Sequence, residues 1–209
     1  MKRVIIYCEG ASEEKFINGI LMPRLAESGV FIRATAFNGV SKYSIIRREL
    51  RNLCRSDRSA IVTTMLDYYG LPKDTPGYSE SQGVFGDVYK TVEYVEKAIE
   101  KDIGEENCWP NILMHEYEAL LFSDVSAFSY CDLSNREISE LESICEEYPT
   151  PEHINNSPDT APSKRILKIC TDYNKVLDGY NIAENIGLVK IRKRCKHFDA
   201  WLKRLENLG

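Results

Sequence analysis

The stretch "VIIYCEGASEEKF", residues 4–16, decides how this chain begins to fold. Its first four residues are apolar or aromatic and predict a short buried strand. "ASEEKF" then has the composition of a helix start, with Ser12 as the predicted N-cap and two acids in the first turn, Glu13 and Glu14. Between them stand Glu9 and Gly10, so the first strand ends on a lone carboxylate beside a residue that lets the backbone turn sharply.

Apolar runs and helical spacings alternate along the next hundred residues. Further strands are predicted at 30–37, at 60–67 and from 111 onward, and helices at 44–55 and 88–103. Pro23 is expected to kink or end the first helix. Strands that alternate with helices predict an α/β fold, here a mostly parallel sheet of about four strands flanked by helices.

Acidic side chains stand at or near the ends of three predicted strands. Glu9 follows the first strand, Asp67 ends the third, and Glu116 and Glu118 follow the fourth. The carboxyl ends of parallel strands lie at one edge of a sheet, where functional crevices of α/β proteins are found. Carboxylates brought together there repel one another, and a divalent ion such as Mg²⁺ or Mn²⁺ relieves that repulsion. The pattern therefore favours a metal site of the phosphoryl-transfer kind.

The choice between Glu116 and Glu118 depends on local structure. On a strand the two side chains would point to one side, whereas at a helix start they diverge and only one reaches the ion. Glu116 is favoured because it lies nearer the apolar strand. His115 is interpreted either as a packed histidine or as a general base or ligand. Asp124 is interpreted as a cap or supporting residue in a turn.

The opening stretch "YCEGASEEKF" resembles the start of a TOPRIM domain, the α/β domain of topoisomerases, primases and OLD-type nucleases. Five further blocks, "DYYGLPKDTPG", "HEYEALLFSD", "PEHIN", "APSKRI" and "IRKRCKHFDAWL", resemble a bacterial TOPRIM-like group catalogued as domain of unknown function 4276. These blocks extend from the first strand to the last predicted helix, so the resemblance covers nearly the whole chain.

The resemblance implies a TOPRIM-like core with a helical C-terminal extension, which we expect at 1–130 and 131–209. It also implies a magnesium-dependent site, a role in bacterial defence against phage or foreign DNA, and an ABC- or AAA-type ATPase partner. Glu9 matches the TOPRIM glutamate and Asp67 the first Asp of Asp-x-Asp. Tyr69 stands where the second Asp would be. Either Glu116 or Glu118 then supplies the missing carboxylate, or the site binds metal weakly or not at all.

The C-terminal part differs from the rest in charge. From residue 163 onward it holds 11 basic and 5 acidic residues, whereas residues 1–162 hold 16 basic and 27 acidic ones. Such a split suggests an acidic part that holds cations and a basic part that holds phosphates, or simply helical surfaces of different charge.

Two basic segments are candidates for phosphate contact. "TAPSKRI" places Ser163 as a predicted helix cap beside Lys164 and Arg165, which predicts either a phosphate site at a helix N-terminus or an ordinary capped helix. Arg192 and Arg194 belong to a basic surface on a helix near the C-terminus. That surface could contact a nucleic-acid backbone, remain solvated or dock on a partner protein.

Cysteine usage and hydropathy limit the setting. The seven cysteines are odd in number and form no CxxC pair, which indicates free thiols in a reducing cytoplasm. No apolar run approaches the roughly 18 residues that a membrane span needs, and no GxxxxGK[ST] loop offers an ATP site. ATP dependence would therefore come from a partner. The oligomeric state is open, and an oligomer is possible.

Three functions are compatible with these observations. The first, favoured by the resemblance, is a magnesium-dependent nuclease that cleaves DNA or RNA, with Lys164 or Arg165 steadying the phosphate. The second is a catalytically inactive TOPRIM-like subunit that binds nucleic acid or an ATPase. The third is another metal-dependent phosphoryl-transfer enzyme, one that acts on nucleotides. The residue pattern alone supports only an α/β protein with an acidic metal site.

Overall fold

In a computed structural model of the protein, the residues whose structure is described are 2–37, 39, 42–131, 133–154, 157 and 160–209. Within these ranges the strands form one parallel sheet of five strands in the order β2-β1-β3-β4, with β5 also paired to β3. The strands are β1 (Lys2–Cys8), β2 (Val30–Ala36), β3 (Ile61–Asp67), β4 (Cys108–Trp109) and β5 (Ile112–Leu113). The predicted α/β class and parallel sheet are confirmed. Of the fourth strand, which is predicted from residue 111 onward, β5 is present, and β4 lies just before it.

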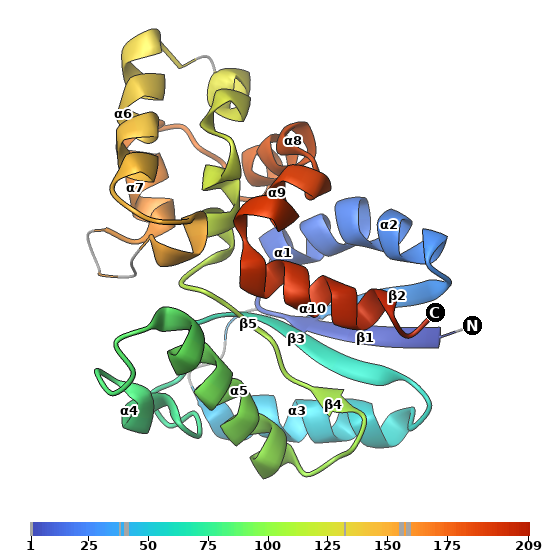
Figure 1. Cartoon of the computed structure of the whole chain (residues 1–209). Helices are drawn as coiled ribbons and strands as arrows, with labels where there is room; N and C mark the ends of the chain where they lie inside the picture. The colour runs from blue at the N-terminus through green and yellow to red at the C-terminus, as the bar shows by residue number, and fades with distance from the viewer. Residues whose placement is uncertain (1, 38, 40–41, 132, 155–156, 158–159) are drawn as a thin grey trace.

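The helices lie on both sides of the sheet (Figure 1). Those around the first three strands are α1 (Ala11–Phe16), the π-helical turn η1 (Ile17–Leu21), α2 (Met22–Glu27), α3 (Tyr43–Ser56), α4 (Tyr78–Ser81) and α5 (Val88–Ile103). The rest are the 3-10 helices η2 (Tyr117–Ser123), η3 (Val125–Cys131) and η4 (Pro151–His153), and α6 (Asn135–Glu146), α7 (Pro162–Ile169), α8 (Leu177–Ile186), α9 (Leu188–Arg194) and α10 (Lys196–Glu206).

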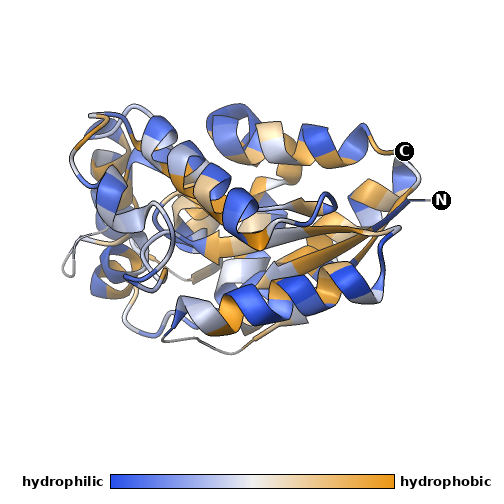
Figure 2. Ribbon diagram, turned by 90° about the horizontal axis from the view of Figure 1, so that it is seen from below, coloured by the Kyte–Doolittle hydropathy of each residue, from blue (hydrophilic) through white to orange (hydrophobic). Residues whose placement is uncertain are grey.

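The sheet is covered on both faces because side chains of β1 alternate between them. Val4, Ile6 and Cys8 pack with α1, α2 and the C-terminal helices, whereas Ile5 and Tyr7 pack with α3 and α5. Figure 2 shows the strands mostly orange between helices that carry both orange and blue residues. The first hydrophobic core includes residues on both sides of the 130/131 boundary, and the division into two domains there stays a prediction.

The edge strand beside β3 is interrupted at Pro110, which has no N–H to donate. The threonine hydroxyls of β3 bridge the gap: Thr63 Oγ1 donates to Trp109 O at 2.6 Å and Thr64 Oγ1 to Asn111 O at 2.5 Å. Asn111 N in turn donates to Thr64 Oγ1 at 2.9 Å. The short β5 is therefore held to β3 just before the chain reaches its acidic residues.

Three helix ends differ from the prediction. Gly10, not Ser12, is the N-cap of α1, because the Glu13 carboxylate reaches back to Gly10 N at 2.9 Å. Pro23 does not end the first helix; it lies in the first turn of α2, directly after η1. Ala161, not Ser163, is the N-cap of α7, since Pro162 occupies the first helical position.

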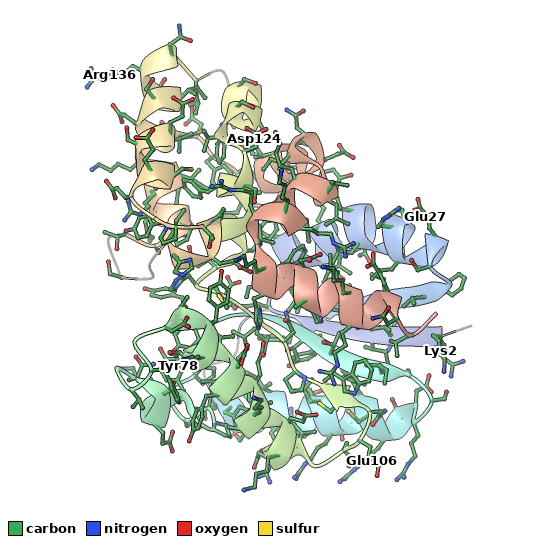
Figure 3. The ribbon with its side chains drawn as sticks, in the orientation of Figure 1. Lys2, Glu27, Tyr78, Glu106, Asp124 and Arg136 are labelled. Atoms are coloured by element: carbon green, nitrogen blue, oxygen red, sulfur yellow. The ribbon has the colours of Figure 1, made fainter. Side chains whose placement is uncertain are left out.

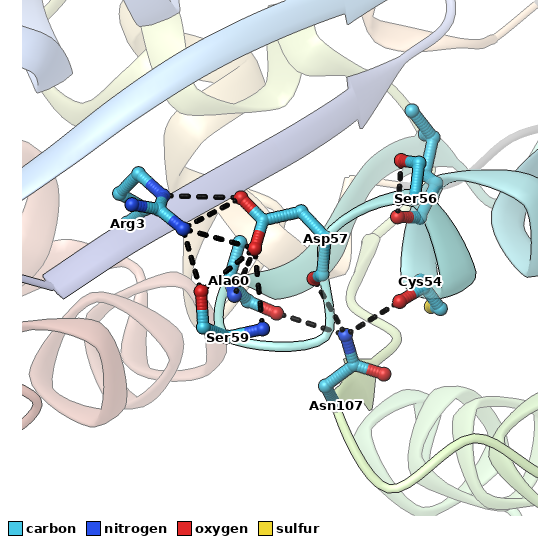
Figure 4. Close-up of polar contacts among 8 residues, drawn as sticks. Arg3, Cys54, Ser56, Asp57, Ser59, Ala60 and Asn107 are labelled. Carbon is cyan, nitrogen blue, oxygen red and sulfur yellow. Dashed lines mark hydrogen bonds and ion pairs between the residues drawn. The ribbon is translucent and has the colours of Figure 1, made fainter.

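The N-terminal edge of the sheet is fastened by a set of paired polar groups (Figure 4). Arg3 Nε and Nη2 donate to the two carboxylate oxygens of Asp57, both at 3.0 Å. Asn107 Nδ2 lies 2.9–3.2 Å from the carbonyl oxygens of Cys54, Asp57 and Ala60. We call these groups the N-terminal staple; it closes the loop that leads into β3.

Two further features bear on the predicted setting. All seven cysteines are free thiols. In the described ranges, no helix has both the length and the apolar character needed to cross a bilayer.

Candidate functional site

An acidic hollow lies at the C-terminal edge of the sheet, as the strand ends predict. It has a volume of about 250 Å³, and its lining includes Glu9, Glu13, Asp67, Glu118 and Lys175. The rest of the lining consists of Gly10, Ala11, Ser12 and Gly39. The register explains the convergence: Cys8 pairs with Met65 and Asp67 with Leu113, so the strands end at nearly the same level. We refer to this feature as the acidic hollow.

Glu9 is held over the backbone of the segment that follows β3. A Cβ atom on Gly70 would lie 2.5 Å from Glu9 Oε2 and 2.9 Å from Oε1, so only glycine leaves room for the carboxylate. Burial raises the pKa of Glu9; the backbone of Asp67 and the charge of Lys175 lower it, and Glu116 and Glu118 raise it. Gly70 is thus a site residue that the sequence analysis missed, although "DYYG" places it three residues after Asp67.

Asp67 and Glu13 have raised pKa values for the same reasons. For Asp67 the largest cause is burial, followed by the charges of Glu13, Glu118, Glu9 and Glu116. Asp67 Oδ1 accepts a hydrogen bond from Tyr117 N at 2.9 Å, which fixes its direction. Burial likewise raises the pKa of Glu13, and the charge of Glu9 adds to it. Raised pKa values mark these carboxylates as short of compensating positive charge.

Lys175 is the second residue that the sequence analysis missed. It lies between α7 and α8, and its ammonium group pairs with Glu118 at 3.2 Å. Partial burial lowers the pKa of Lys175, but the charges of Glu118 and Glu116 outweigh this and the pKa is raised overall. In the described part of the chain it is the single cationic side chain of the lining. No motif around Lys175 signals this position, because only the fold brings it to the strand ends.

Glu116 and Glu118 diverge, as a helix start requires. Glu118 belongs to the first turn of η2 and lines the hollow with 3% of its surface exposed. Glu116 is the N-cap residue of η2, and its Oε2 accepts a hydrogen bond from Ser163 N at 2.8 Å, at the first turn of α7. The structure thus places Glu118, rather than the favoured Glu116, among the lining residues; the role of either as a ligand stays a prediction.

His115 is held in a strained turn just before these acids. Its φ is 68°, the single positive value among the described residues other than glycine. Glu116 N donates to Met114 O at 3.0 Å across it, which is the hydrogen bond of a γ-turn. His115 O accepts from Tyr69 N at 3.0 Å, and its side chain is buried. Such strain persists where the surrounding structure enforces it, often at functional sites.

The remaining predicted residues lie away from the lining of the hollow. Tyr69 is 43% exposed and takes part through its backbone. Asp124 accepts hydrogen bonds from Ser126 and pairs with Lys190, so it caps a turn (Figure 3). Lys164 is exposed on α7. Ser163 N donates a hydrogen bond to Glu116. The predicted phosphate contact of Ser163, Lys164 and Arg165 stays a prediction.

The basic residues near the C-terminus are partly neutralised within the chain. Arg192 pairs with Asp199 at 2.6 Å and with Glu206 at 2.7 Å, and Arg165 pairs with Glu147 at 3.7 Å. Arg194 is exposed at the end of α9. Nucleic-acid contact by Arg192 and Arg194 stays a prediction.

The donor chemistry of the hollow suits a hard divalent cation, since carboxylate oxygens with unrelieved repulsion are what Mg²⁺ and Mn²⁺ bind. As the side chains stand, no three His, Cys, Asp or Glu side chains within the described ranges are grouped to hold an ion. Metal binding would therefore need these carboxylates to turn toward one point, and Glu118 to loosen its pair with Lys175.

Two solved structures resemble the chain at low identity. Both are of the C-terminal region of the Xanthomonas campestris pv. campestris OLD protein. The one phased with iodine is 14% identical, covers 100% of this chain and 99% of that chain, and has a TM-score of 0.42. The one phased with mercury is 13% identical, covers 97% of each chain, and has a TM-score of 0.43. Likeness at these scores assigns no role to any residue.

The family comparison is decisive where the structural one is not. No curated protein sequence matches the chain. A family model does match, from residue 8 to residue 206, and it therefore spans both the strand-end acids and the helical C-terminal part. The resemblance carried by the quoted motifs is confirmed at the level of the family: the chain belongs to the family described as Domain of unknown function (DUF4276).

Proposed function

We propose that this protein is a magnesium- or manganese-dependent nuclease that cleaves DNA or RNA phosphodiesters at the acidic hollow. The observation that carries the proposal is electrostatic. Four carboxylates, those of Glu9, Glu13, Asp67 and Glu118, line one small hollow with raised pKa values, against the single cation Lys175 in the described lining. An unliganded cluster of this kind costs stability, and a bound cation with a phosphate removes that cost.

Each residue of the acidic hollow has a distinct role in this proposal. Glu9, Asp67 and Glu118 would hold the ion, with Glu13 fixed close by through its bond to Gly10 N. When bound, the metal supplies a water of lowered pKa and polarises the phosphate. Lys175, which pairs with Glu118 at 3.2 Å, would on release pair with a phosphate oxygen and stabilise charge that develops during cleavage. Glu116 keeps η2 and α7 together through Ser163 N.

Calorimetric titration with Mn²⁺ and Mg²⁺ tests the ion site first. We expect binding by the wild type and its loss in both Glu9→Gln and Asp67→Asn. Glu106→Gln is the matched control, because Glu106 is an exposed acid on the loop before β4 (Figure 3). Cleavage of single-stranded and duplex DNA and of RNA should follow the same pattern. Turnover of mononucleotides in place of polymers would favour a different phosphoryl-transfer enzyme.

A second function, a catalytically inactive subunit that binds nucleic acid or an ATPase, is favoured by two observations. Tyr69 replaces the expected second acid, and Lys175 already neutralises Glu118. On this proposal the wild type binds nucleic acid with a steep salt dependence but neither binds metal nor cleaves. The ABC- or AAA-type partner and the role in phage defence rest on the family resemblance, and co-purification with the neighbouring gene product tests them.

A further inference from the structure

A second groove adjoins the acidic hollow. It lies between the first helix, including η1, and α8, and has a volume of about 480 Å³. Ala11 lines both the groove and the hollow, so the two are contiguous along α1. The groove is lined by Ala11, Glu14, Lys15, Asn18, Gly19 and Tyr180. None of these residues carries a role in the function proposed above.

The ring of Tyr180 packs against Gly19 in η1. A Cβ atom on Gly19 would lie 2.3 Å from Tyr180 Cε2 and 2.9 Å from Cζ, so the ring occupies the space that any other residue would fill. Tyr180 OH donates to Glu184 Oε1 at 2.7 Å, which fixes the outer end of the ring. Tyr180 is therefore an aromatic surface of fixed orientation beside the hollow.

Lys15 shows what the exposed side of this ring attracts. Its ammonium group lies 5.1 Å from the ring centroid, a cation–π contact. A lysine side chain is flexible, and such a contact at a partly exposed site is worth only about 0.5–1 kcal/mol. A flat ligand can therefore take the place of the ammonium group over the ring, which frees Lys15 to pair with a phosphate.

The other lining groups suit a nucleobase. Glu14 offers a carboxylate that accepts hydrogen bonds from base amino groups, and Asn18 offers both a donor and an acceptor. Both lie on the same side of the first helix as Lys15. Asn18 and Gly19 belong to the π-helical turn, a feature often found at functional sites. The volume lies within the range of small-molecule sites, about 300–1,000 Å³.

We propose that this groove binds one unpaired nucleotide of a single-stranded nucleic acid, with its base stacked on Tyr180 and its phosphate near Lys15. The inference deepens the proposed function, because the groove would then hold the nucleotide next to the phosphodiester in the acidic hollow. Stacking on an aromatic ring tolerates every base, whereas Glu14 favours bases that present amino groups.

The test is fluorescence anisotropy with a labelled single-stranded oligonucleotide in EDTA, which needs neither metal nor cleavage. Tyr180→Leu should weaken binding about tenfold, and Gly19→Ala should weaken it as well by displacing the ring. Tyr180→Phe keeps the ring and should keep the affinity. Tyr94→Leu is the matched control, since Tyr94 is a 42% exposed aromatic on α5, outside the groove.

Each outcome decides the proposal. A loss confined to Tyr180→Leu and Gly19→Ala, in variants that melt as the wild type does, supports it. Equal affinity in all variants overturns it, as does a loss in Tyr180→Phe as large as in Tyr180→Leu. Failure of the wild type to bind oligonucleotide also overturns it. Metal-dependent cleavage that proceeds normally in Tyr180→Leu would overturn this inference alone and leave the proposed nuclease standing.

Discussion

Asp57, in the loop before β3, and Asp67, the last residue of β3, are in opposite electrostatic states. Asp57 belongs to the N-terminal staple, where hydrogen bonds from Arg3 and Ser59 lower its pKa to about 2. Asp67 borders the acidic hollow, where burial and four neighbouring carboxylates raise its pKa. At the N-terminal edge the carboxylate of Asp57 is paired with Arg3 and Ser59. At the C-terminal edge the described lining of the hollow has more acidic side chains than basic ones. The contrast favours the C-terminal edge as the place of the proposed cation site, whereas the polar groups of the N-terminal edge pair with one another.

The sharpest test of this contrast is the pair Asp67→Asn and Asp57→Asn. We expect Asp67→Asn to lower the affinity for Mn²⁺ more than about 100-fold, since it removes a ligand and not merely an outer partner. Asp57→Asn should leave that affinity unchanged, because Asp57 lies at the other end of β3. Calorimetric titration measures both, and equal effects from the two variants would remove the distinction between the edges.

The substitution Lys175→Met removes the single cationic side chain in the described lining of the hollow. With its partner gone, the buried Glu118 carboxylate is uncompensated, and the metal-free protein should lose about 1 kcal/mol of unfolding free energy at pH 8. At pH 5 the loss should shrink, because the raised pKa of Glu118 lets it bind a proton. Urea unfolding at both pH values gives the comparison, and Lys164→Met on exposed α7 is the control.

His115 offers a test of the strain beside the hollow. At a φ of 68°, a β-branched side chain is strongly disfavoured, whereas asparagine adopts this conformation readily. His115→Val should therefore unfold about 1–2 kcal/mol more easily than His115→Asn. Both variants lack the imidazole, so the difference between them isolates the backbone. Equal stabilities in urea would mean that the turn relaxes without cost.

The pH dependence of stability should differ in sign between the two edges. Glu9, Glu13, Asp67 and Glu118 have folded pKa values above their ordinary ones, so the folded state holds protons more tightly and loses stability as the pH rises above about 4. Each unit by which a pKa is raised corresponds to about 1.4 kcal/mol. Asp57 contributes stability that is lost as the pH falls from 3.8 to about 2.

Urea unfolding of metal-free protein from pH 2 to pH 8 measures both slopes. Pairing with Glu96 raises the pKa of His197. His197 therefore also makes the free energy of unfolding fall as the pH rises. The doubly substituted Glu9→Gln, Asp67→Asn protein keeps His197, so the part of the slope that it loses belongs to the acidic hollow. A slope that the double substitution leaves intact would assign the effect to His197.

The smallest expected effect is that of Asp57→Asn on stability at neutral pH. Asp57 is on the surface, and exposed ion pairs contribute little, although its oxygens also accept from Ser59 N and Ala60 N. We expect a modest fall in the melting temperature, largest at low salt.

Asp67→Asn should leave the melting temperature equal or higher, because it removes a repelled charge while the amide oxygen can still accept from Tyr117 N.

The sequence by itself determined the family, the α/β class, the three long strands, and the helices predicted at 44–55 and 88–103, which the structure has at 43–56 and 88–103. These follow from short-range patterns of apolar residues, which set which face each element buries. It also determined that Glu9, Asp67 and one of the acids after β5 meet, because parallel strands share one carboxyl edge. It placed helix starts less well, since Glu13 caps through a glycine backbone that no side-chain rule detects.

Only the tertiary structure decided which groups surround the acids. Lys175 reaches Glu118 from a loop 57 positions along the chain, and Gly70 leaves the space that Glu9 fills. Glu116, the N-cap residue of η2, turns to α7, whereas Glu118 in the first turn of η2 lines the hollow. The ring of Tyr180 likewise fills the space that a side chain at position 19 would occupy. These contacts join residues far apart in sequence, and they depend on packing and charge in three dimensions, which no local pattern encodes.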